Sequence, residues 1–416
     1  MSRLFGADGF EDAVALPRGG MTLQLTGRDT GRTLQTLVAL AIVPVAISAT
    51  WLALASDHLE RPLATALYRS YLAAAPMLIG LYWWRRRPAS RFGPLLIVFG
   101  ITAWIVSWQS SDWPLAFDLG VLAEAPGVVL TFYLFLAFPS GYLETAADRV
   151  LVGAWTVVMF GFYIPWALAS PVIAGAGPLT SCVPACPDNV LQIGSAPRLV
   201  DVLSQWEIYL ALALTVAVLV VYAARLRAAS RPRQRALIAV AVTSLLFLPV
   251  FFTFHFSRQV LELDAGTLQT MSWVVVGARV LLPLGFLVAL VQADLFAGAA
   301  RANLLQELIT RPSPERWRDV VALALDDPGL RMAYWDTTSH RYLEPDGNEL
   351  TTQAGPNRTW VEADHDGRPV AAMHIDRALA EDPELLKVAT SATVLAIEHG
   401  KLEGELLESQ ARIIAA

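Results

Sequence analysis

Residues 271–296 read MSWVVVGARVLLPLGFLVALVQADLF, and the charged side chains in this run are Arg279 and, close to its end, Asp294. A bilayer core about 30 Å thick is crossed by about 20 mainly apolar helical residues. The crossing segment must be helical because lipid offers the backbone no hydrogen-bond partners. The run therefore predicts a membrane-spanning helix, and the rest of the chain is interpreted around it.

The composition of the whole chain agrees with this prediction. Of 416 residues, 55% are hydrophobic and 16% are charged, against about 25% charged in an ordinary globular protein. This excludes a soluble enzyme, a disordered regulator and a collagen-like chain. The net charge of −6, without a basic block, argues against nucleic acid as a partner. The expected partner is the lipid bilayer.

Eight apolar runs satisfy the length requirement. They are continuously apolar, which excludes the alternating strands of a membrane β-barrel. The sequence therefore predicts an α-helical polytopic membrane protein with eight transmembrane helices, which together form one membrane domain over residues 33–296. The predicted spans are Thr33–Ala55, Ala64–Trp84, Phe92–Trp108, Leu115–Phe138, Val150–Ala169, Ile208–Ala224, Ala236–Phe256 and Met271–Phe296.

Arginine predicts the orientation, because positively charged loops stay on the cytoplasmic side. The N-terminal tail and the alternate loops that follow it hold fourteen Arg residues, and the other loops hold three. The larger group is Arg3, Arg18, Arg28, Arg32, Arg85, Arg86, Arg87, Arg91, Arg149, Arg225, Arg227, Arg231, Arg233 and Arg235; the smaller is Arg61, Arg198 and Arg258. We expect a multi-pass protein of the cell (plasma) membrane with both termini in the cytoplasm. The tail, residues 1–32, does not resemble a signal peptide, so the first span is expected to be retained.

Four charged residues fall inside the predicted spans, where a charge is costly unless it is partnered. They are Arg69, Asp118, Glu124 and Arg279. Counting from the outer end of each span places all four in the outer half of the bilayer. One interpretation is a set of ion pairs that holds helix register. The other is a polar cavity that opens outward, in which a ligand or a proton disturbs the pairing. His255, near an outer helix end, is expected to be an interfacial side chain.

Two cysteines, Cys182 and Cys186, lie in the longest outer loop. A thiol pair outside the cell tends to oxidise, so a small disulfide is the first expectation. Thiol-based redox or metal sensing is a second interpretation, although two thiols do not complete a zinc site. Two unpaired cysteines are the third.

After the last span the chain predicts a small cytoplasmic α+β domain. A juxtamembrane helical linker, residues 297–314, leads to a helix over Glu315–Leu325 that begins after Ser313-Pro314, a helix-start signature. Short extended runs joined by turns follow, and Asp-Gly between such runs favours hairpins. The result is an antiparallel sheet over residues 315–380. The extended runs are Leu330–Trp335, Arg341–Leu343, Thr359–Glu362 and Pro369–Ile375.

Residues 381–416 predict one helix with a heptad pattern, which is typical of a parallel dimeric coiled coil. The rival interpretation is an amphipathic helix whose first half packs on the sheet. The helical pattern runs to the last residue, so we expect more chain to follow. The predicted coiled-coil core is Leu385, Val388, Ala392, Leu395, His399, Leu402, Leu406 and Ile413, with Ser409 as a polar lapse.

Several short stretches, in this order, resemble the input half of the membrane sensor histidine kinases of actinobacteria. In those kinases an "AIEN-x-x-L-x-x-EL" helix and an "S-x-ARI" stretch precede the phosphoacceptor helix. The matching stretches are AFPSGYL (137–143), CVPACPDN (182–189), ARVLLPLGF (278–286), DGRPVAA (366–372), EDPEL (381–385), LAIEHGKLEGEL (395–406) and SQARII (409–414).

The resemblance implies a membrane-bound sensor whose signal passes through a GAF-like domain and a signalling helix to a kinase core. Its parent activity is ATP-dependent histidine autophosphorylation and phosphotransfer to a response regulator, which would be a partner only if a kinase core follows. The phosphoacceptor box and the ATP-binding domain are missing from the 416 residues. His399 is followed by Gly400, not by an acidic residue, so we expect it to pack within a helix.

No catalytic, cofactor-binding or metal-binding motif is evident elsewhere in the sequence, so we expect no enzyme activity from these residues. Two other functions stay open. One is a stand-alone receptor or scaffold that forms mixed dimers with kinases. The other is a transporter with a regulatory tail, although no inverted repeat is evident.

Overall fold

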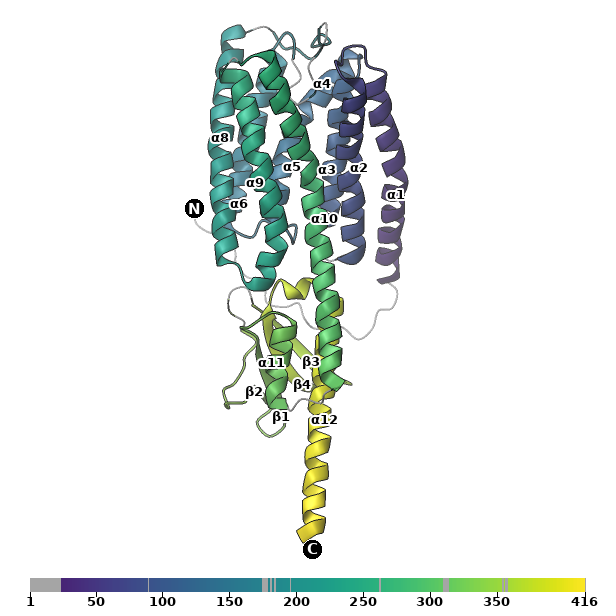
Figure 1. Cartoon of the computed structure of the whole chain (residues 1–416), viewed down its shortest axis with the longest axis vertical. Coiled ribbons are helices and arrows are strands. Elements are labelled where there is room, and N and C mark those ends of the chain that lie inside the picture. Colours follow the sequence, from purple (N-terminus) through teal and green to yellow (C-terminus); the bar gives the residue numbers. More distant parts are fainter. Residues whose placement is uncertain are drawn as a thin grey trace, which may run out of the picture.

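The computed structural model describes residues 24–88, 90–173, 179, 182, 185–194, 196–261, 263–309, 314–353, 355 and 358–415. A helical bundle occupies one end of an elongated molecule, a small sheet domain lies below it, and the last helix extends beyond that domain (Figure 1). The bundle helices are α1 (Gln24–Leu54), α2 (Pro62–Arg86), α3 (Phe92–Val106), α4 (Pro114–Leu122), α5 (Glu124–Ala137), α6 (Ala146–Val158), α7 (Ile164–Ala169), α8 (Pro197–Ala228), α9 (Arg231–Val260) and α10 (Ala265–Ile309).

Within the described part of the chain, seven helical stretches are long and apolar enough to cross a membrane. They correspond to every predicted span except the second. The second predicted span is also a helix, α2, which packs along α1 and α3. Its side chains Tyr68 and Arg69 are buried by protein, which explains why it is less apolar than its neighbours. The structure therefore shows several long apolar helices that could span a membrane, and eight spans remain a prediction.

Three predicted spans are interrupted instead of continuous. The third ends in a 3₁₀ turn, η1 (Ser107–Ser110). The fourth is divided at Ala123 into α4 and α5. The fifth contains a π-helical turn, η2 (Met159–Tyr163), between α6 and α7. Irregular backbone at membrane depth is tolerated where protein buries it or where it lines a cavity.

The longest helix, α10, has 45 residues and is about 67 Å long at 1.5 Å per residue. It extends from the distal end of the bundle, the end farthest from the sheet domain, down into that domain (Figure 1). The predicted linker after residue 296 is therefore the continuation of the last membrane helix as far as Ile309.

The antiparallel sheet is confirmed. It follows α11 (Pro314–Ala324) and has four strands in the order β2-β1-β4-β3. The β3–β4 hairpin turns at Asp366-Gly367, both with positive φ, the turn chemistry that Asp-Gly favours. Its membership of a GAF-like fold remains a prediction. The strands are β1 (Arg331–Asp336), β2 (Arg341–Leu343), β3 (Arg358–His365) and β4 (Arg368–Asp376), and β4 is followed by a 3₁₀ turn, η3 (Leu379–Glu381).

The core of the sheet domain needs helices from outside the predicted 315–380 range. Residues of α10 and of α12 (Pro383–Ala415) are buried together with α11 and the sheet. The four strands have 6, 3, 8 and 9 residues. This small sheet has one apolar face to cover, and these helices cover it. The predicted domain boundaries at residues 297 and 381 therefore lie inside one packed unit. Its buried members include Ala297, Ala300, Leu304, Trp317, Val321, Met332, Met373, Ile375, Leu385, Ala389 and Ala392.

The helix α12 has two halves with different surroundings. Leu385 and Ala392, predicted for a coiled-coil core, are 1% and 2% exposed inside the sheet domain of their own chain. This corrects the heptad assignment for both residues, because a side chain covered by its own domain cannot also pack against a partner helix. The first half of α12 thus packs on the sheet of its own chain, as the alternative to a coiled coil expects. Beyond it, Leu402 and Ile413 are 62% and 73% exposed.

Candidate functional site

A chain of polar side chains connects four helical elements inside the bundle, α2, η1, α5 and the turn η2. Gln109 is buried and lies at its centre. Its Oε1 accepts from Arg69 Nη2 at 3.0 Å, and its Nε2 donates to Glu124 Oε1 at 2.8 Å. The other carboxylate oxygen of Glu124 accepts from the hydroxyl of Tyr163 at 3.1 Å. The neutral side-chain amide of Gln109 therefore bridges the Glu124 carboxylate and the Arg69 guanidinium.

The three interruptions of the bundle helices position this chain. Gln109 lies in the 3₁₀ turn after α3, Glu124 begins α5 directly after the break at Ala123, and Tyr163 ends the π-helical turn. The turn geometry leaves backbone oxygens that these side chains satisfy: Gln109 Nε2 also donates to the oxygen of Gly120 at 3.0 Å. The local departures from α-helix thus bring polar groups from three helices to one place.

A small cavity adjoins Glu124. Its volume is about 40 Å³, room for two or three water molecules. Three ionisable side chains line it, Glu124, His255 and Arg279, and the rest of its wall is apolar or glycine. The Nε2 atom of His255 is buried without a hydrogen-bond partner. The remaining lining residues are Leu72, Phe99, Ala103, Val106, Gly127, Val128, Phe251, Leu282 and Pro283.

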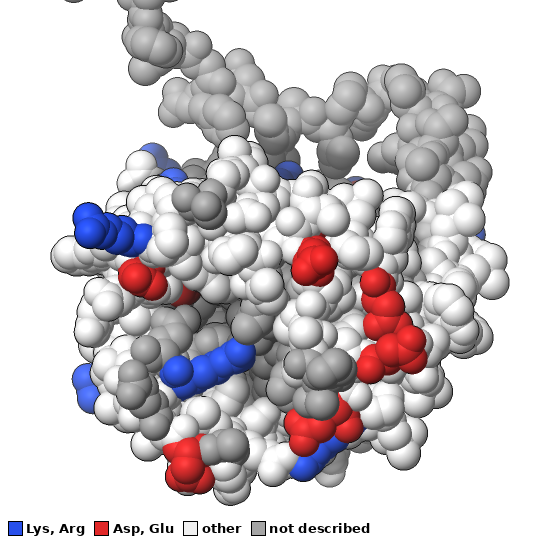
Figure 2. Space-filling model, turned by 90° about the horizontal axis from the view of Figure 1, so that it is seen from above, with Lys and Arg blue, Asp and Glu red and all other residues white. Residues whose placement is uncertain are grey.

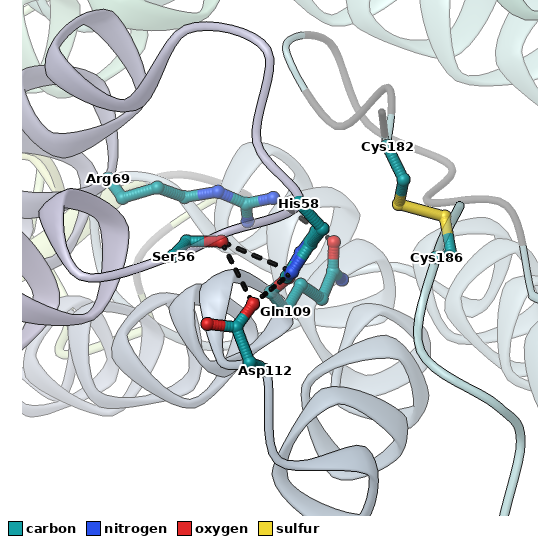
Figure 3. The surroundings of a disulfide bond; sticks show 7 residues. All are labelled: Ser56, His58, Arg69, Gln109, Asp112, Cys182 and Cys186. Atoms are coloured by element: carbon teal, nitrogen blue, oxygen red, sulfur yellow. Dashed lines mark hydrogen bonds and ion pairs between the residues drawn. A yellow bond between two sulfur atoms is a disulfide. The ribbon is translucent and has the colours of Figure 1, made fainter. Parts of the chain in front are cut away.

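A second polar layer lies at the distal end of the bundle, in the loop between α1 and α2. Figure 3 shows His58 between Asp112 and Gln109. Its Nδ1 is 2.7 Å from Asp112 Oδ1, and its Nε2 is 3.2 Å from the backbone oxygen of Gln109. The hydroxyl of Ser56 also contacts Nδ1, at 3.1 Å.

These residues do not form a nucleophilic triad. A histidine that activates a serine uses one ring nitrogen for the serine and the other for the carboxylate. Here Ser56 and Asp112 share Nδ1 of His58, and Nε2 faces the backbone. The arrangement instead connects an exposed carboxylate to the turn that carries Gln109.

The loop between α7 and α8 packs on this layer. Cys182 and Cys186 form a disulfide, and Cys182 makes an isolated β-bridge with Leu59, next to His58 (Figure 3). Asp118 belongs here rather than to the inner chain: its Oδ2 accepts from the backbone nitrogens of Val190 and Leu191, at 2.8 and 3.2 Å. Viewed from this end, isolated acidic and basic side chains lie on a mostly uncharged, hollowed surface (Figure 2).

The structure thus separates the four predicted intramembrane charges. Arg69 reaches Glu124 through Gln109, Arg279 lines the cavity beside Glu124, and Asp118 holds the loop between α7 and α8. Among the described residues no direct ion pair joins any two of the four. His255, predicted to be interfacial, lines the cavity.

Several residues of the site were missed from the sequence. They are Ser56, His58, Gln109, Asp112 and Tyr163. A neutral glutamine at a span end gives no charge signal, and His58 and Asp112 are far apart in the chain. The one available signal was the clustering of Ser, Gln and Asp at residues 107–112 within an otherwise apolar run.

Within the described residues there is no group of three or more His, Cys, Asp or Glu side chains placed to hold a metal ion. The chain matches no protein-family model, no curated protein and no solved structure.

Proposed function

We propose that this protein is a membrane-bound signal sensor, the input and transmission part of a two-component sensor histidine kinase. The observation that carries the proposal is the course of α10. One unbroken helix lines the cavity with Arg279 and then supplies Ala297, Ala300 and Leu304 to the core of the sheet domain. A shift of α10 at the cavity must therefore move that core, because packed interiors transmit displacement.

The proposed orientation places the sheet domain and both termini in the cytoplasm. The arginines at the base of the bundle support it. Arg86 ends α2, and Arg225 lies in the last turn of α8, at the same end of the bundle as the sheet domain (Figure 1). Positively charged ends of membrane helices favour the cytoplasmic side.

Contacts at the base of the bundle couple the sheet domain to more than α10. Tyr82 donates from its hydroxyl to Asp294 at 3.0 Å, which joins α2 to the point where α10 leaves the bundle. Arg235, at the start of α9, is 3.1 Å from Asp326 in the loop after α11. The sheet domain thus contacts α9 directly and is joined to α2 through α10. Relative movement of these three helices would therefore displace it.

The output element in this proposal is the second half of α12. It presents an exposed apolar stripe at heptad spacing, formed by Leu395, Leu402, Leu406 and Ile413. A second copy of the chain is the proposed partner, since heptad spacing suits two parallel helices. Two packings of this pair of helices, close in energy, would serve as signal states, with the stimulus favouring one.

Histidine phosphorylation and phosphotransfer would be carried out by a kinase core. In the kinases that the sequence resembles, the signalling helix leads to a phosphoacceptor histidine, which is phosphorylated from ATP and passes the phosphoryl group to a response regulator. We assign no catalytic residue, cofactor or metal to the chain itself, and His399 has no catalytic part in the proposal.

Cysteine crosslinking in native vesicles tests the proposal. Leu402→Cys lies on the exposed stripe, and the neighbouring Lys401→Cys, also exposed, is the matched control outside the heptad core. We expect Leu402→Cys to form dimers and Lys401→Cys to form few. The rate at Leu402→Cys should then change when the cavity wall is altered by Leu282→Trp. Equal crosslinking of Leu402→Cys and Lys401→Cys would contradict the proposal. A crosslinking rate of Leu402→Cys that is the same with and without Leu282→Trp would also contradict it.

A further inference from the structure

One line of exposed apolar residues runs along α10 from the bundle into the sheet domain. Its members are alternately three and four positions apart, which is the spacing of core positions in a coiled coil. The line is about 52 Å long at 1.5 Å per residue. This α10 seam consists of Val274, Gly277, Leu281, Leu284, Val288, Val291, Leu295, Gly298, Ala302, Leu305 and Ile309, all of them exposed.

Inside the bundle the seam is narrower than the lipid-facing surface of α1. Between Gly277 and Val291 every seam residue is exposed, and every other residue of α10 is buried or half-buried. In α1, by contrast, consecutive residues such as Val43 and Pro44 are both exposed. A stripe restricted to two heptad positions is typical of a coiled-coil interface. The α10 seam thus has the width that one partner helix covers.

The seam also continues where lipid cannot cover it. Asp294 is 3.8 Å from Arg86 at the end of α2, and charged side chains of this kind lie at the edge of the hydrocarbon layer. Leu305 and Ile309 lie about 16 and about 22 Å beyond Asp294 along the helix, and they are 53% and 81% exposed. The opposite side of α10 is covered by the sheet domain, in which Leu304 is buried.

The composition of the seam suits a second copy of the same helix. Two copies inserted in one membrane with the same orientation form a parallel pair about a two-fold axis, so each seam residue faces its own equivalent. A charged residue on the seam would then face a like charge. The seam carries none, although Asp294, Arg301 and Glu307 lie beside it.

Two glycines on the seam are not explained by packing within the chain. A methyl group added at Gly277 or at Gly298 would meet no described atom within 4 Å. Small residues at such positions let two membrane helices approach closely. Their place on the seam therefore agrees with helix–helix contact there.

We propose that a second copy of the chain covers the α10 seam, with the two α10 helices parallel both inside the membrane and along the sheet domains. The helix α12 packs beside the lower end of α10 and continues in the same direction (Figure 1). The exposed stripe of α12 can therefore follow the same two-fold axis. The pairing of α10 does not require a kinase; that it carries a signal rests on the proposed function.

Oxidative crosslinking of single engineered cysteines tests the pairing, with the full chain in phosphatidylcholine vesicles. Inside the bundle, Val288→Cys lies on the seam, and Val220→Cys on α8 is the control for random collisions in lipid. Val220 is the more exposed of the two, at 62% against 45%. Beyond the bundle, Ala302→Cys lies on the seam and the exposed neighbour Asn303→Cys lies off it. We expect both seam variants to form dimers about tenfold faster than their controls, a preference of about 1.4 kcal/mol.

Leu305→Glu tests the seam without changing the thiol chemistry, and the exposure of Leu305 means that the fold should tolerate it. In the proposed pair the two new carboxylates face each other, and like charges in contact disfavour association. Leu305→Glu should therefore slow the crosslinking of Ala302→Cys about tenfold. Asn303→Glu, off the seam, should leave that rate unchanged when it is combined with Ala302→Cys.

Equal rates for Val288→Cys and Val220→Cys would mean that lipid covers the seam, and would overturn the proposal. Equal rates for Ala302→Cys and Asn303→Cys, or a rate unaffected by Leu305→Glu, would overturn it as well. Crosslinking along the seam without crosslinking of Leu402→Cys would support the α10 pair and count against the proposed function. Crosslinking of Leu402→Cys alone would overturn the α10 pair and leave the proposed function standing.

Discussion

Gln109 and Glu124 are joined by a hydrogen bond of 2.8 Å from the amide Nε2 to the carboxylate Oε1. The same amide accepts from Arg69 on its other side, at 3.0 Å. The neutral side chain of Gln109 therefore stands between the Arg69 cation and the Glu124 anion, whose other partners are the backbone oxygen of Val106 and the hydroxyl of Tyr163.

We expect Gln109→Leu to destabilise the bundle strongly. Loss of the amide removes hydrogen bonds to Arg69 and Glu124, and hydrogen bonds to charged groups contribute about 1.5–3 kcal/mol. The melting temperature of the vesicle-embedded protein should fall. Gln205→Leu, at an exposed position of α8, is the control and should melt close to the parent. Equal melting of the two variants would show that the amide bridge is unimportant.

Asp112→Ala should loosen the loop between α1 and α2. The carboxylate contacts His58 Nδ1 at 2.7 Å and accepts from the backbone nitrogen of Asp57 at 3.0 Å. Its removal leaves the buried His58 without that partner, a cost of about 1–3 kcal/mol. Faster hydrogen exchange at residues 56–60 is the expected result. Asp57→Ala keeps its backbone donor and exposes no new polar group, so its exchange should stay unchanged.

Two ion pairs at the base of the bundle should differ sharply in importance. Asp148 is fully buried, pairs with Arg225 at 2.5 Å, and caps α6 through Thr145. Removing one partner of a buried pair costs about 3–5 kcal/mol. Glu144 pairs with Arg233 at 2.5 Å but is exposed, and surface pairs contribute about 0–1 kcal/mol.

Asp148→Ala should therefore lower the melting temperature far more than Glu144→Ala. The two variants remove carboxylates four positions apart, from pairs of the same length, and they differ in burial and in the cap of α6, which Asp148 also supplies. Thermal unfolding of both variants in vesicles measures the two losses of melting temperature. Comparable losses would contradict the distinction between buried and exposed pairs at this end of the molecule.

The sheet domain should become less stable in mild acid. Burial lowers the pKa of His374, and Arg331 and Arg358 lower it further, against the hydrogen bond that Nε2 donates to the oxygen of Thr351 and the charge of Glu344. The folded domain therefore keeps this histidine neutral. The unfolded chain binds a proton below about pH 6.5, so stability is present above that pH and is lost as the pH falls below it.

His374→Gln should flatten this pH dependence, because glutamine does not titrate. Limited proteolysis of the sheet domain at about pH 7.5 and about pH 5.5, on either side of the free histidine pKa, measures the effect. His340→Gln, in the exposed turn before β2, serves as the control and should behave as the parent. Acid sensitivity that persists unchanged in His374→Gln would assign the effect to another group.

The main elements follow from local properties of the chain. A run such as Met271–Phe296 must form a helix in lipid, because its backbone groups have no other partners. Short extended runs around Asp366-Gly367 predict a hairpin for similarly local reasons. Hydropathy and turn chemistry depend on neighbours in sequence, so the membrane helices and the antiparallel sheet could be predicted without tertiary information.

The placement of side chains depended on packing between distant segments. Charge and depth drew attention to Arg69 and Glu124, but the neutral Gln109 between them became visible only when η1 and α5 met. The heptad pattern of α12 was equally incomplete: it does not reveal that Leu385 faces its own sheet while Leu402 is exposed. Periodicity predicts an apolar face, and the tertiary structure decides what covers it, because burial depends on which elements of the folded chain come together.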